Sequence, residues 1–299
     1  MKLEVLKTTP APKSQNMVLD LVASGLATDA LTLLGINVTL WIASLFLGKT
    51  WPVDFVWSGW PPIMCLLILL RSSFAGNRHR QLVVCVLVSL WGYRLTHNFV
   101  ARGGIGHEDW RYADMRAQFG KHFWWISFFS VFLGQTIFLF GGCLTLYGAL
   151  LNTSPLSPTD AIAATVAALS ILLEAAADLQ MDAFQSARRE KRTDAVVIDR
   201  GLWLWSRHPN YLGEIGWWWG LYLFGASAAP TWVCAGPIAM TLLFVGITIQ
   251  LMEDRQIKNK PEAFAEYKRR VPSALLLVPP PVNRAIGDWL YRASVPAMR

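Results

Sequence analysis

Three acidic residues in the stretch ILLEAAADLQMDAFQ could bind a polar ligand inside a lipid bilayer. Glu174, Asp178 and Asp182 are spaced four residues apart, so a helix places them on one stripe. An ionisable side chain near the bilayer centre costs about 2.5–3.5 kcal/mol on insertion scales, so three are tolerated only beside a polar cavity or cationic partners. We expect them to bind hydroxyl or amide groups of a ligand. The structural alternative pairs Asp178 with an arginine and leaves Asp182 at the membrane surface.

A basic loop follows this stripe and could bind phosphate groups. Guanidinium and ammonium groups bind phosphate through charge-assisted hydrogen bonds, although in membrane proteins such residues also mark one side of the bilayer. Together with acids that hold ribose hydroxyls, the loop would suit a pyrophosphate and a 2'-phosphate. Its cations are Arg188, Arg189, Lys191, Arg192, Arg200 and Arg207.

The next helix begins at SRHPNYLGEIGWWWG and carries a carboxylate, Glu214, into an apolar segment. Pro209 suits the first turn of a helix, where Asn210 and the free backbone amides can bind an anion or an amide. Glu214 follows one turn later, away from solvent. We therefore expect Glu214 to act as a hydrogen-bond acceptor or an acid inside a cavity. The tryptophans of 217–219 are more typical of packing or lipid contact than of substrate binding.

The elements that position these residues are transmembrane helices. The chain is 54% hydrophobic and 16% charged, and several runs approach the roughly 20 apolar residues that cross a bilayer. We predict an all-α integral membrane protein whose seven helices enclose a cofactor cavity open to the cytoplasm. Pro61 and Pro62 are expected to break the second span. The predicted spans are 29–48, 51–70, 81–101, 123–151, 158–184, 211–228 and 231–252.

The chain is predicted to form one membrane domain, 29–280, between an amino-terminal segment, 1–28, and a tail, 281–299. Residues 1–16 lack the apolar core of a cleavable signal peptide, so we expect them to be retained. Residues 17–28 are amphipathic enough to lie on the membrane surface or to extend the first helix.

The charges of the loops predict the orientation of the protein in the membrane. The loops 102–122 and 186–210 and the tail from Glu253 are rich in Arg and Lys, so the positive-inside rule places them in the cytoplasm. The net charge of +7 is attributed to this topology and to anionic lipid headgroups, not to nucleic acid. Three arginines fall on the other side and oppose this orientation: Arg71, Arg78 and Arg80.

Histidine and cysteine do not indicate a metal site. The five histidines form no HxxH, HxxxH or HExxH pair, and the four cysteines form no CxxC pair. We expect no metal, and we expect the cysteines to be reduced packing residues.

Three segments carry a resemblance to a known family. SRHPNYLGEIGWW, EAAADLQMDAFQ and the tail MEDRQIKNKPEAFAEYKRRVPSALLLVP resemble the carboxyl-terminal domain of the steroid 5-alpha-reductase family. With GHEDWRYADMR, the pattern is similar to a broad microbial branch of that family. The resemblance implies a seven-helix membrane fold that holds NADPH and transfers hydride to a carbon–carbon double bond conjugated to a carbonyl. The substrate would be a lipophilic small molecule, and we expect a monomer in contact with membrane lipids.

The family's functional positions transfer residue by residue. The polar residue and the aspartate that contact the cofactor on the fifth helix match Asp178 and Asp182, with Gln185 or Ser186 where relatives often carry arginine. The asparagine and the glutamate that open the sixth helix match Asn210 and Glu214. The remaining residues that we assign to the cofactor are Arg188, Arg207, His208, Tyr211, Arg255 and Tyr267, the last two in the segment that closes over it.

The acid pair that polarises the carbonyl departs from the family pattern. Steroid reductases use a glutamate on the second span and a tyrosine on the third, whereas this chain offers Asp54 and, in WGYRLTHN, a displaced Tyr93. We therefore expect Glu214, Asp54 or Tyr93 to donate a hydrogen bond to the carbonyl oxygen as an enolate develops. The departure weakens the case for a steroid substrate more than the case for the cofactor.

Two other functional classes stay open. RHPNYLG also resembles the motif of isoprenylcysteine carboxyl methyltransferases, which hold S-adenosylmethionine with an Arg-His-Pro turn and tail glutamates. Here Glu253 and Asp254 would supply the tail acids. The third class is a non-catalytic lipid-binding or transport protein, which would explain buried charges but not the three family segments together.

Overall fold

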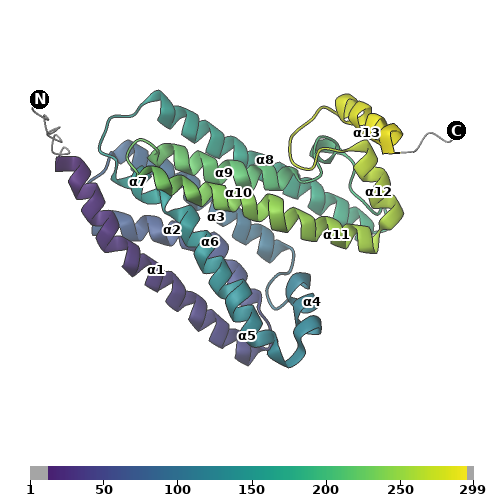
Figure 1. Cartoon of the computed structure of the whole chain (residues 1–299), viewed down its shortest axis with the longest axis horizontal. Coiled ribbons are helices and arrows are strands. Elements are labelled where there is room, and N and C mark those ends of the chain that lie inside the picture. The colour runs from purple at the N-terminus through teal and green to yellow at the C-terminus, as the bar shows by residue number, and fades with distance from the viewer. Residues whose placement is uncertain (1–12, 295–299) are drawn as a thin grey trace, which may run out of the picture.

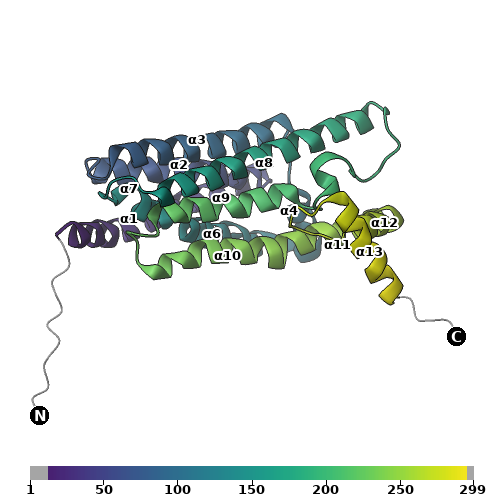
Figure 2. The ribbon, with the colours of Figure 1, turned by 90° about the horizontal axis from the view of Figure 1, so that it is seen from above.

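The computed structural model describes residues 13–294, and every regular element in that range is helical. The helices pack into a bundle (Figures 1 and 2). The chain is thus a multi-pass membrane protein, as its composition predicts. Six helical stretches are long and apolar enough to cross a membrane: Gly25–Leu47, Trp51–Arg71, Arg78–Ala101, Trp110–Leu151, Pro158–Arg189 and Thr231–Asn259.

The predicted seventh span corresponds to α9 (Pro209–Gly225), which is not one of these six stretches. Its 17 residues are fewer than the roughly 20 that usually cross a bilayer. It nevertheless lies inside the bundle, packed against α7 (Thr145–Leu151) and α8 (Pro158–Arg189). Seven spans therefore stay a prediction.

The structure describes both ends of the predicted membrane domain. Residues 17–28 extend the first helix, the second of the two possibilities predicted for them, because α1 runs without interruption over Lys13–Leu47. The predicted tail, 281–299, begins with α13 (Pro280–Ser294), a helix that the boundary did not anticipate. Residues 1–12 and 295–299 lie outside the described part of the chain, as does most of the segment on which the signal-peptide expectation rests. The remaining helices are α2 (Asp54–Arg71), α3 (Arg78–Ala101), α4 (Trp110–Phe119), α5 (Phe123–Ser127), α6 (Gly134–Cys143), α10 (Ala235–Leu243), α11 (Ile249–Asn259) and α12 (Pro261–Arg270).

The expectation that Pro61 and Pro62 break the second span is wrong, because α2 continues through both. Proline has no N–H, so Pro62 cannot bond the carbonyl of Ser58 one turn earlier. Gly92 of α3 approaches at that point: a Cβ on Gly92 would lie 2.5 Å from the Ser58 carbonyl oxygen. The Ser58 hydroxyl also pairs with Thr96 of α3 at 2.8 Å. Close contact with α3 therefore stabilises the proline-containing helix.

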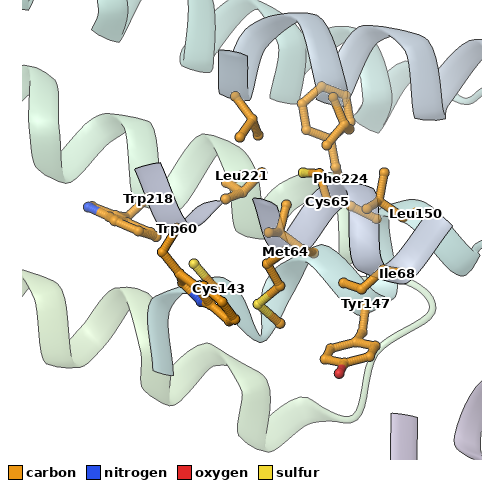
Figure 3. Packing of buried hydrophobic residues seen from close by; sticks show 14 of the residues in the cluster. Trp60, Met64, Cys65, Ile68, Cys143, Tyr147, Leu150, Trp218, Leu221 and Phe224 are labelled. Atoms are coloured by element: carbon orange, nitrogen blue, oxygen red, sulfur yellow. The ribbon is translucent and has the colours of Figure 1, made fainter. Parts of the chain in front are cut away.

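An apolar core holds α2, α7 and α9 together (Figure 3). Gly220 of α9 packs directly on α8, since a Cβ there would lie 2.8 Å from the Ala167 backbone nitrogen. The same close approach of α9 to α8 places Gly213, the neighbour of Glu214, against the side chain of Glu174. Residues of this core that Figure 3 labels are Trp60, Met64, Cys65, Ile68, Cys143, Tyr147, Leu150, Trp218, Leu221 and Phe224.

The two ends of the bundle differ. The end at which α3 ends and α4, α12 and α13 gather is called the loop end here (Figure 1). At the opposite end, Arg71 pairs with the buried Asp29 at 2.5 Å, and Arg80 pairs with Asp160 at 2.5 Å. Two of the three arginines that oppose the predicted orientation are thus neutralised by structural ion pairs. Arg78 lies over the ring of Phe74.

A strap without regular secondary structure, residues 271–279, covers the start of α9. The backbone N–H groups of Arg207 and His208 donate to the carbonyls of Ser273 and Ala274, each at 3.0 Å. The fully buried Asn283 of α13 donates to three backbone carbonyls, among them that of Trp205. The strap therefore fixes the turn that leads into α9.

Candidate functional site

Two helices face each other with matching polar side chains towards the loop end. From α3, Arg94 pairs with both Glu174 and Asp178 of α8, the latter at 2.8 Å. Asn98 donates to the same Asp178 carboxylate at 2.8 Å. The side chains of Glu174 and Arg94 are only 4% and 13% exposed. Direct pairing with a cation lowers the cost of burying these acids.

The pairing continues one turn further out. Arg102 bonds Asp182 at 2.7 Å and lies 3.6 Å from Asp178. We call the set formed by Arg94 and Asn98 of α3 and Arg102, the residue that caps α3, with the α8 acids the charge ladder. Arg94, Asn98 and Arg102 are spaced four apart, as the acids are, and this repeat is a sequence signal that the predicted site did not use. The predicted alternative, in which Asp178 pairs with an arginine, is thus present. Asp182 was expected to lie at the membrane surface; it is 39% exposed, but it too pairs with an arginine.

Glu214 lies in a cage of three tryptophans. One carboxylate oxygen accepts from the indole N–H groups of Trp57 at 3.2 Å and Trp218 at 3.1 Å, and the other accepts from Trp91 at 3.1 Å. We call these four residues the indole cage. The carboxylate is 5% exposed and has a donor on each oxygen. Of the two predicted roles, acceptor and acid, this geometry is that of an acceptor.

Several polar atoms beside the cage are buried without a hydrogen-bond partner. They include the amide oxygen Oδ1 of Asn210, Oε1 of Glu174 and Nε of Arg94. Asn210 precedes Glu214 by one turn on the same face of α9, and Glu174 packs on Gly213. An unsatisfied buried polar group costs about 1–3 kcal/mol. The hydrogen bonding of this region is therefore incomplete among the described residues.

Tyr211 lies where charged groups from several elements meet. Asp178 of α8 and two residues near the start of α4, Asp109 and Arg111, are close enough to act on its hydroxyl electrostatically. Its ring stacks on His208 with centroids 5.3 Å apart. Arg111 bonds Asp109 at 2.8 Å and keeps 42% of its side chain exposed. Asp109 and Arg111 were not predicted from the sequence, because the first residues of a short helix carry no periodic signal.

Two predicted cofactor residues, Arg207 and His208, contact the carboxyl-terminal helices. Arg207 bonds Glu253 of α11 at 2.7 Å, and His208 lies 3.2 Å from the same oxygen. Lys268 of α12 bonds the other oxygen at 2.7 Å. Arg207 also donates to the Val271 and Pro272 carbonyls of the strap. In this conformation Arg207 and His208 tie α9 to the carboxyl-terminal helices.

The other two predicted tail residues also make contacts within the protein. Tyr267 is buried and donates to the Trp203 carbonyl at 2.6 Å. Arg255 lies over the ring of Trp110, 4.2 Å from its centroid, and 3.4 Å from Asp114. These contacts join α11 and α12 to the loop end.

Gln185 and Arg188 lie at the loop-end terminus of α8, beyond the charge ladder. The Gln185 amide contacts the Met181 sulfur at 3.6 Å. Both side chains are partly exposed. Nothing in their contacts assigns them to a ligand.

The structure places the other two predicted proton donors, Asp54 and Tyr93, in different surroundings. Asp54, the first residue of α2, accepts a hydrogen bond from Tyr112 of α4 at 3.3 Å. Tyr93 is 69% exposed on α3 and packs against His97. The structure therefore does not bring Tyr93 to Glu214 or Asp54. The tyrosine that contacts Asp54 is Tyr112, a residue that was not predicted from the sequence.

Glu108 anchors α4, the helix that carries Tyr112 and Arg111. Its carboxylate accepts from Arg116 at 2.7 Å and from the Thr50 hydroxyl at 3.1 Å. Burial tends to raise the pKa of Glu108, but the Arg116 and Thr50 donors outweigh it and hold the pKa below its ordinary value. The carboxylate therefore adds stability above its ordinary pKa, and this stability is lost as the pH falls through the lowered value.

We expect Glu108→Gln to destabilise the protein by about 1–2 kcal/mol above about pH 5, because a charged acceptor is lost. The difference from the parent should close as the pH falls further, since glutamine does not titrate. Unfolding midpoints in detergent across this pH range measure the effect, with the exposed Glu262→Gln as control. A gap that is independent of pH would contradict the assignment.

The fold and the site define a multi-pass membrane protein with a buried charge network towards one end. Over residues 40–271 the chain matches the family described as "Protein of unknown function (DUF1295)", and it belongs to that family. It is also 30% identical over 240 residues to an uncharacterized protein of Schizosaccharomyces pombe, a match that covers 70% of this chain and 68% of the yeast protein. No solved structure matches the chain.

Proposed function

We propose that the protein is a membrane-bound, NADPH-dependent reductase of a carbon–carbon double bond conjugated to a carbonyl in a lipophilic substrate. This is the reaction that the resemblance to the steroid 5-alpha-reductase family implies. The observation that carries the proposal is the group of unpaired polar atoms on Asn210, Glu174 and Arg94, directly beside the indole cage. A bound polar ligand would satisfy atoms that the protein leaves without partners.

The residues present fit a dinucleotide. The unpaired amide oxygen of Asn210 can accept a hydrogen bond from a carboxamide N–H. Asp182 and Arg102 are partly exposed and can bind ribose hydroxyls and phosphate oxygens respectively. Arg111 also keeps part of its guanidinium exposed near Tyr211. These side chains come from α3, α4, α8 and α9, the elements that meet towards the loop end.

The bound cofactor would supply a hydride to the β carbon of the substrate. Glu214 supplies negative charge one turn from Asn210, where a nicotinamide ring that has given up hydride would be positively charged. The three indoles hold that carboxylate in one orientation and exclude water from it. A fixed, water-excluded charge acts more strongly than a solvated one.

We place the loop end in the cytoplasm, where NADPH is available. The basic loops 102–122 and 186–210 support this orientation under the positive-inside rule. The ion pairs of Arg71 and Arg80 at the opposite end remove much of the contrary charge.

The cofactor assignment predicts a loss of NADPH binding in Asp178→Asn. The substitution keeps the shape but removes the charge that holds Arg94, Asn98 and Arg102, so these side chains no longer present the site correctly. We expect the apparent NADPH affinity to fall by about 10-fold or more, the effect of roughly 1.4 kcal/mol. The measurement is the NADPH-induced rise in unfolding temperature of the detergent-purified protein.

Asp160→Asn is the matched control, because it also breaks a buried Asp–Arg pair but at the opposite end of the bundle. It should lower the unfolding temperature and leave the NADPH-induced increment unchanged. Equal increments in the parent and in Asp178→Asn would remove the ladder from the cofactor site. No increment in the parent would count against the proposed function itself.

One observation favours a second candidate, an S-adenosylmethionine-dependent membrane methyltransferase. In isoprenylcysteine carboxyl methyltransferases an Arg-His-Pro turn and tail glutamates act together, and here Arg207 and His208 do meet Glu253. The glutamate is, however, held by three cations, with Lys268 as the third. If this candidate is correct, S-adenosylmethionine should raise the unfolding temperature of the protein and NADPH should not.

A further inference from the structure

The helix α13 exposes an apolar face outside the membrane-spanning stretches. With 15 residues it is too short to cross a bilayer, and it belongs to none of the six stretches that could. A contiguous exposed apolar face marks a surface that binds another apolar surface. The face consists of four side chains that are 40–67% exposed and spaced so that a helix places them on one side: Val282, Ile286, Trp289 and Leu290.

Another side of α13 is fixed to the protein. The fully buried Asn283 donates to backbone carbonyls of the strap and of the segment before α9. One turn later, Gly287 lies against α12 so closely that a Cβ would collide with the Arg269 carbonyl oxygen. Asp288 bonds the Arg269 guanidinium at 2.7 Å. These contacts set the rotation of α13 about its axis, so the apolar face points away from them.

α13 lies at the level where the membrane-spanning part of the chain ends. Residues 231–252 carry no charge, and Glu253 is the first charged residue after them. Glu253 bonds Arg207 and His208 at the start of α9. Asn283 of α13 bonds the backbone just before these two residues. α13 is also steeply inclined to the spanning helices and projects to the side of the bundle (Figure 2). A helix in this position follows the membrane surface.

The charge and the aromatic content of this region suit a lipid surface with anionic headgroups. From 253 to 294 the chain has eight Lys and Arg against five Asp and Glu. Basic segments next to a spanning helix are attracted to anionic lipids. Trp289, the most exposed member of the apolar face, is of the residue type that is enriched at the membrane–water boundary. An amphipathic helix with these features binds along the surface of a bilayer.

We propose that α13 anchors the loop end to the bilayer surface, with its apolar face inserted among the acyl chains beside anionic headgroups. The partner is the lipid leaflet in which the spanning helices end. The match to the family stops at residue 271, so the anchor lies outside the part of the chain that carries it. Because Asn283 also bonds the strap and the segment before α9, lipid contact of α13 stabilises the turn that leads to Asn210 and Glu214. The anchor does not depend on the proposed reductase function.

A nitroxide spin label reports what covers the apolar face. The full-length protein is placed, one copy per disc, in lipid nanodiscs of phosphatidylcholine and phosphatidylserine, and Ile286→Cys is labelled. Arg284→Cys, on the opposite side of the helix, is the matched control. The signal of the labelled parent, whose four cysteines are buried or partly buried, is subtracted. We expect the label at position 286 to collide mainly with oxygen, which concentrates in lipid, and the label at position 284 mainly with a water-soluble nickel complex.

Two results of this experiment would overturn the anchor. Collision of the position-286 label mainly with the nickel complex would place the apolar face in water. Protection of that label from both reagents would mean that the protein itself covers the face, since each disc holds one copy.

Trypsin cleavage after Arg284 gives a second measurement that needs no label. Its rate follows the population of locally opened α13, which lipid contact should lower. In the anionic discs we expect Ile286→Gln with Trp289→Gln to be cleaved about 10-fold faster than the parent, the change in rate that follows a 10-fold larger open population. The parent should also be cleaved faster in discs of phosphatidylcholine alone. The control Trp232→Gln removes a tryptophan that is 52% exposed at the start of Thr231–Asn259, and it should be cleaved at the parental rate.

Equal cleavage of the parent and the double variant would overturn the anchor, as would equal cleavage of the parent in the two lipid mixtures. Neither measurement uses NADPH or a substrate. Failure of the anchor therefore leaves the proposed function untouched, and failure of the proposed function leaves the anchor untouched.

Discussion

Glu214→Gln is expected to slow hydride transfer by about 10²-fold or more, while NADPH affinity stays within several-fold of the parent. Glutamine keeps the shape of the side chain but has one acceptor oxygen in place of two. It can satisfy Trp57 and Trp218 only by turning its amide N–H groups towards Trp91, which is itself a donor. The substitution therefore removes the negative charge and leaves one indole without an acceptor.

A control must separate lost charge from lost stability. Trp219→Phe removes an indole hydrogen bond of the same helix, the one to Thr241 at 3.0 Å, without touching Glu214. Stopped-flow oxidation of NADPH should show a slow Glu214→Gln and a nearly unchanged Trp219→Phe. If Glu214→Gln turns over normally but loses NADPH affinity, Glu214 belongs to the binding of the cofactor. If neither quantity changes, the carboxylate has only a structural role.

Arg94→Leu is expected to lower the free energy of unfolding by about 3–5 kcal/mol, the cost of leaving buried carboxylates without their cation. Both Glu174 and Asp178 lose a partner, and only Asp178 keeps others, Asn98 and Arg102. The measurement is the unfolding free energy in mixed micelles, with folding checked by gel filtration.

The double substitution Arg94→Leu with Glu174→Leu provides the matching comparison. It removes both members of the most buried pair of the charge ladder, so it should recover a substantial part of the stability lost in the single variant. Purely additive losses would mean that the two side chains do not depend on each other. That result would contradict the charge ladder.

Hydropathy and spacing were sufficient to predict the helical fold and the acid stripe. Spans of apolar residues and a four-residue repeat are local signals, so 158–184 and the face shared by Glu174, Asp178 and Asp182 could be predicted from sequence alone. The partners of the stripe were harder to predict. Arg94 and Arg102 carry the same spacing, but they lie about 80 residues earlier, and the sequence does not state that α3 packs on α8.

The structure differs from the sequence-based prediction at α2, at α13 and at Tyr112. Pro61 and Pro62 cost helical hydrogen bonds locally, and only the packing of Gly92 against Ser58 shows how the helix tolerates them. The helix α13 begins at Pro280, a residue suited to a first helical turn, whereas residues 281–299 were predicted only as a tail. Tyr112 meets Asp54 through tertiary contacts between α4 and α2, which no local pattern encodes.

The central claim is hydride transfer from NADPH to a lipid, and a double-label experiment tests it most directly. Purified protein is incubated with an extract of membrane lipids, NADPH deuterated at the transferable position and S-adenosylmethionine with a labelled methyl group. Products are analysed by mass spectrometry. The proposed function predicts that a lipid gains one deuterium together with one solvent hydrogen and that no labelled methyl group is transferred. Transfer of the labelled methyl group to a lipid, with no deuterium incorporated, would contradict it.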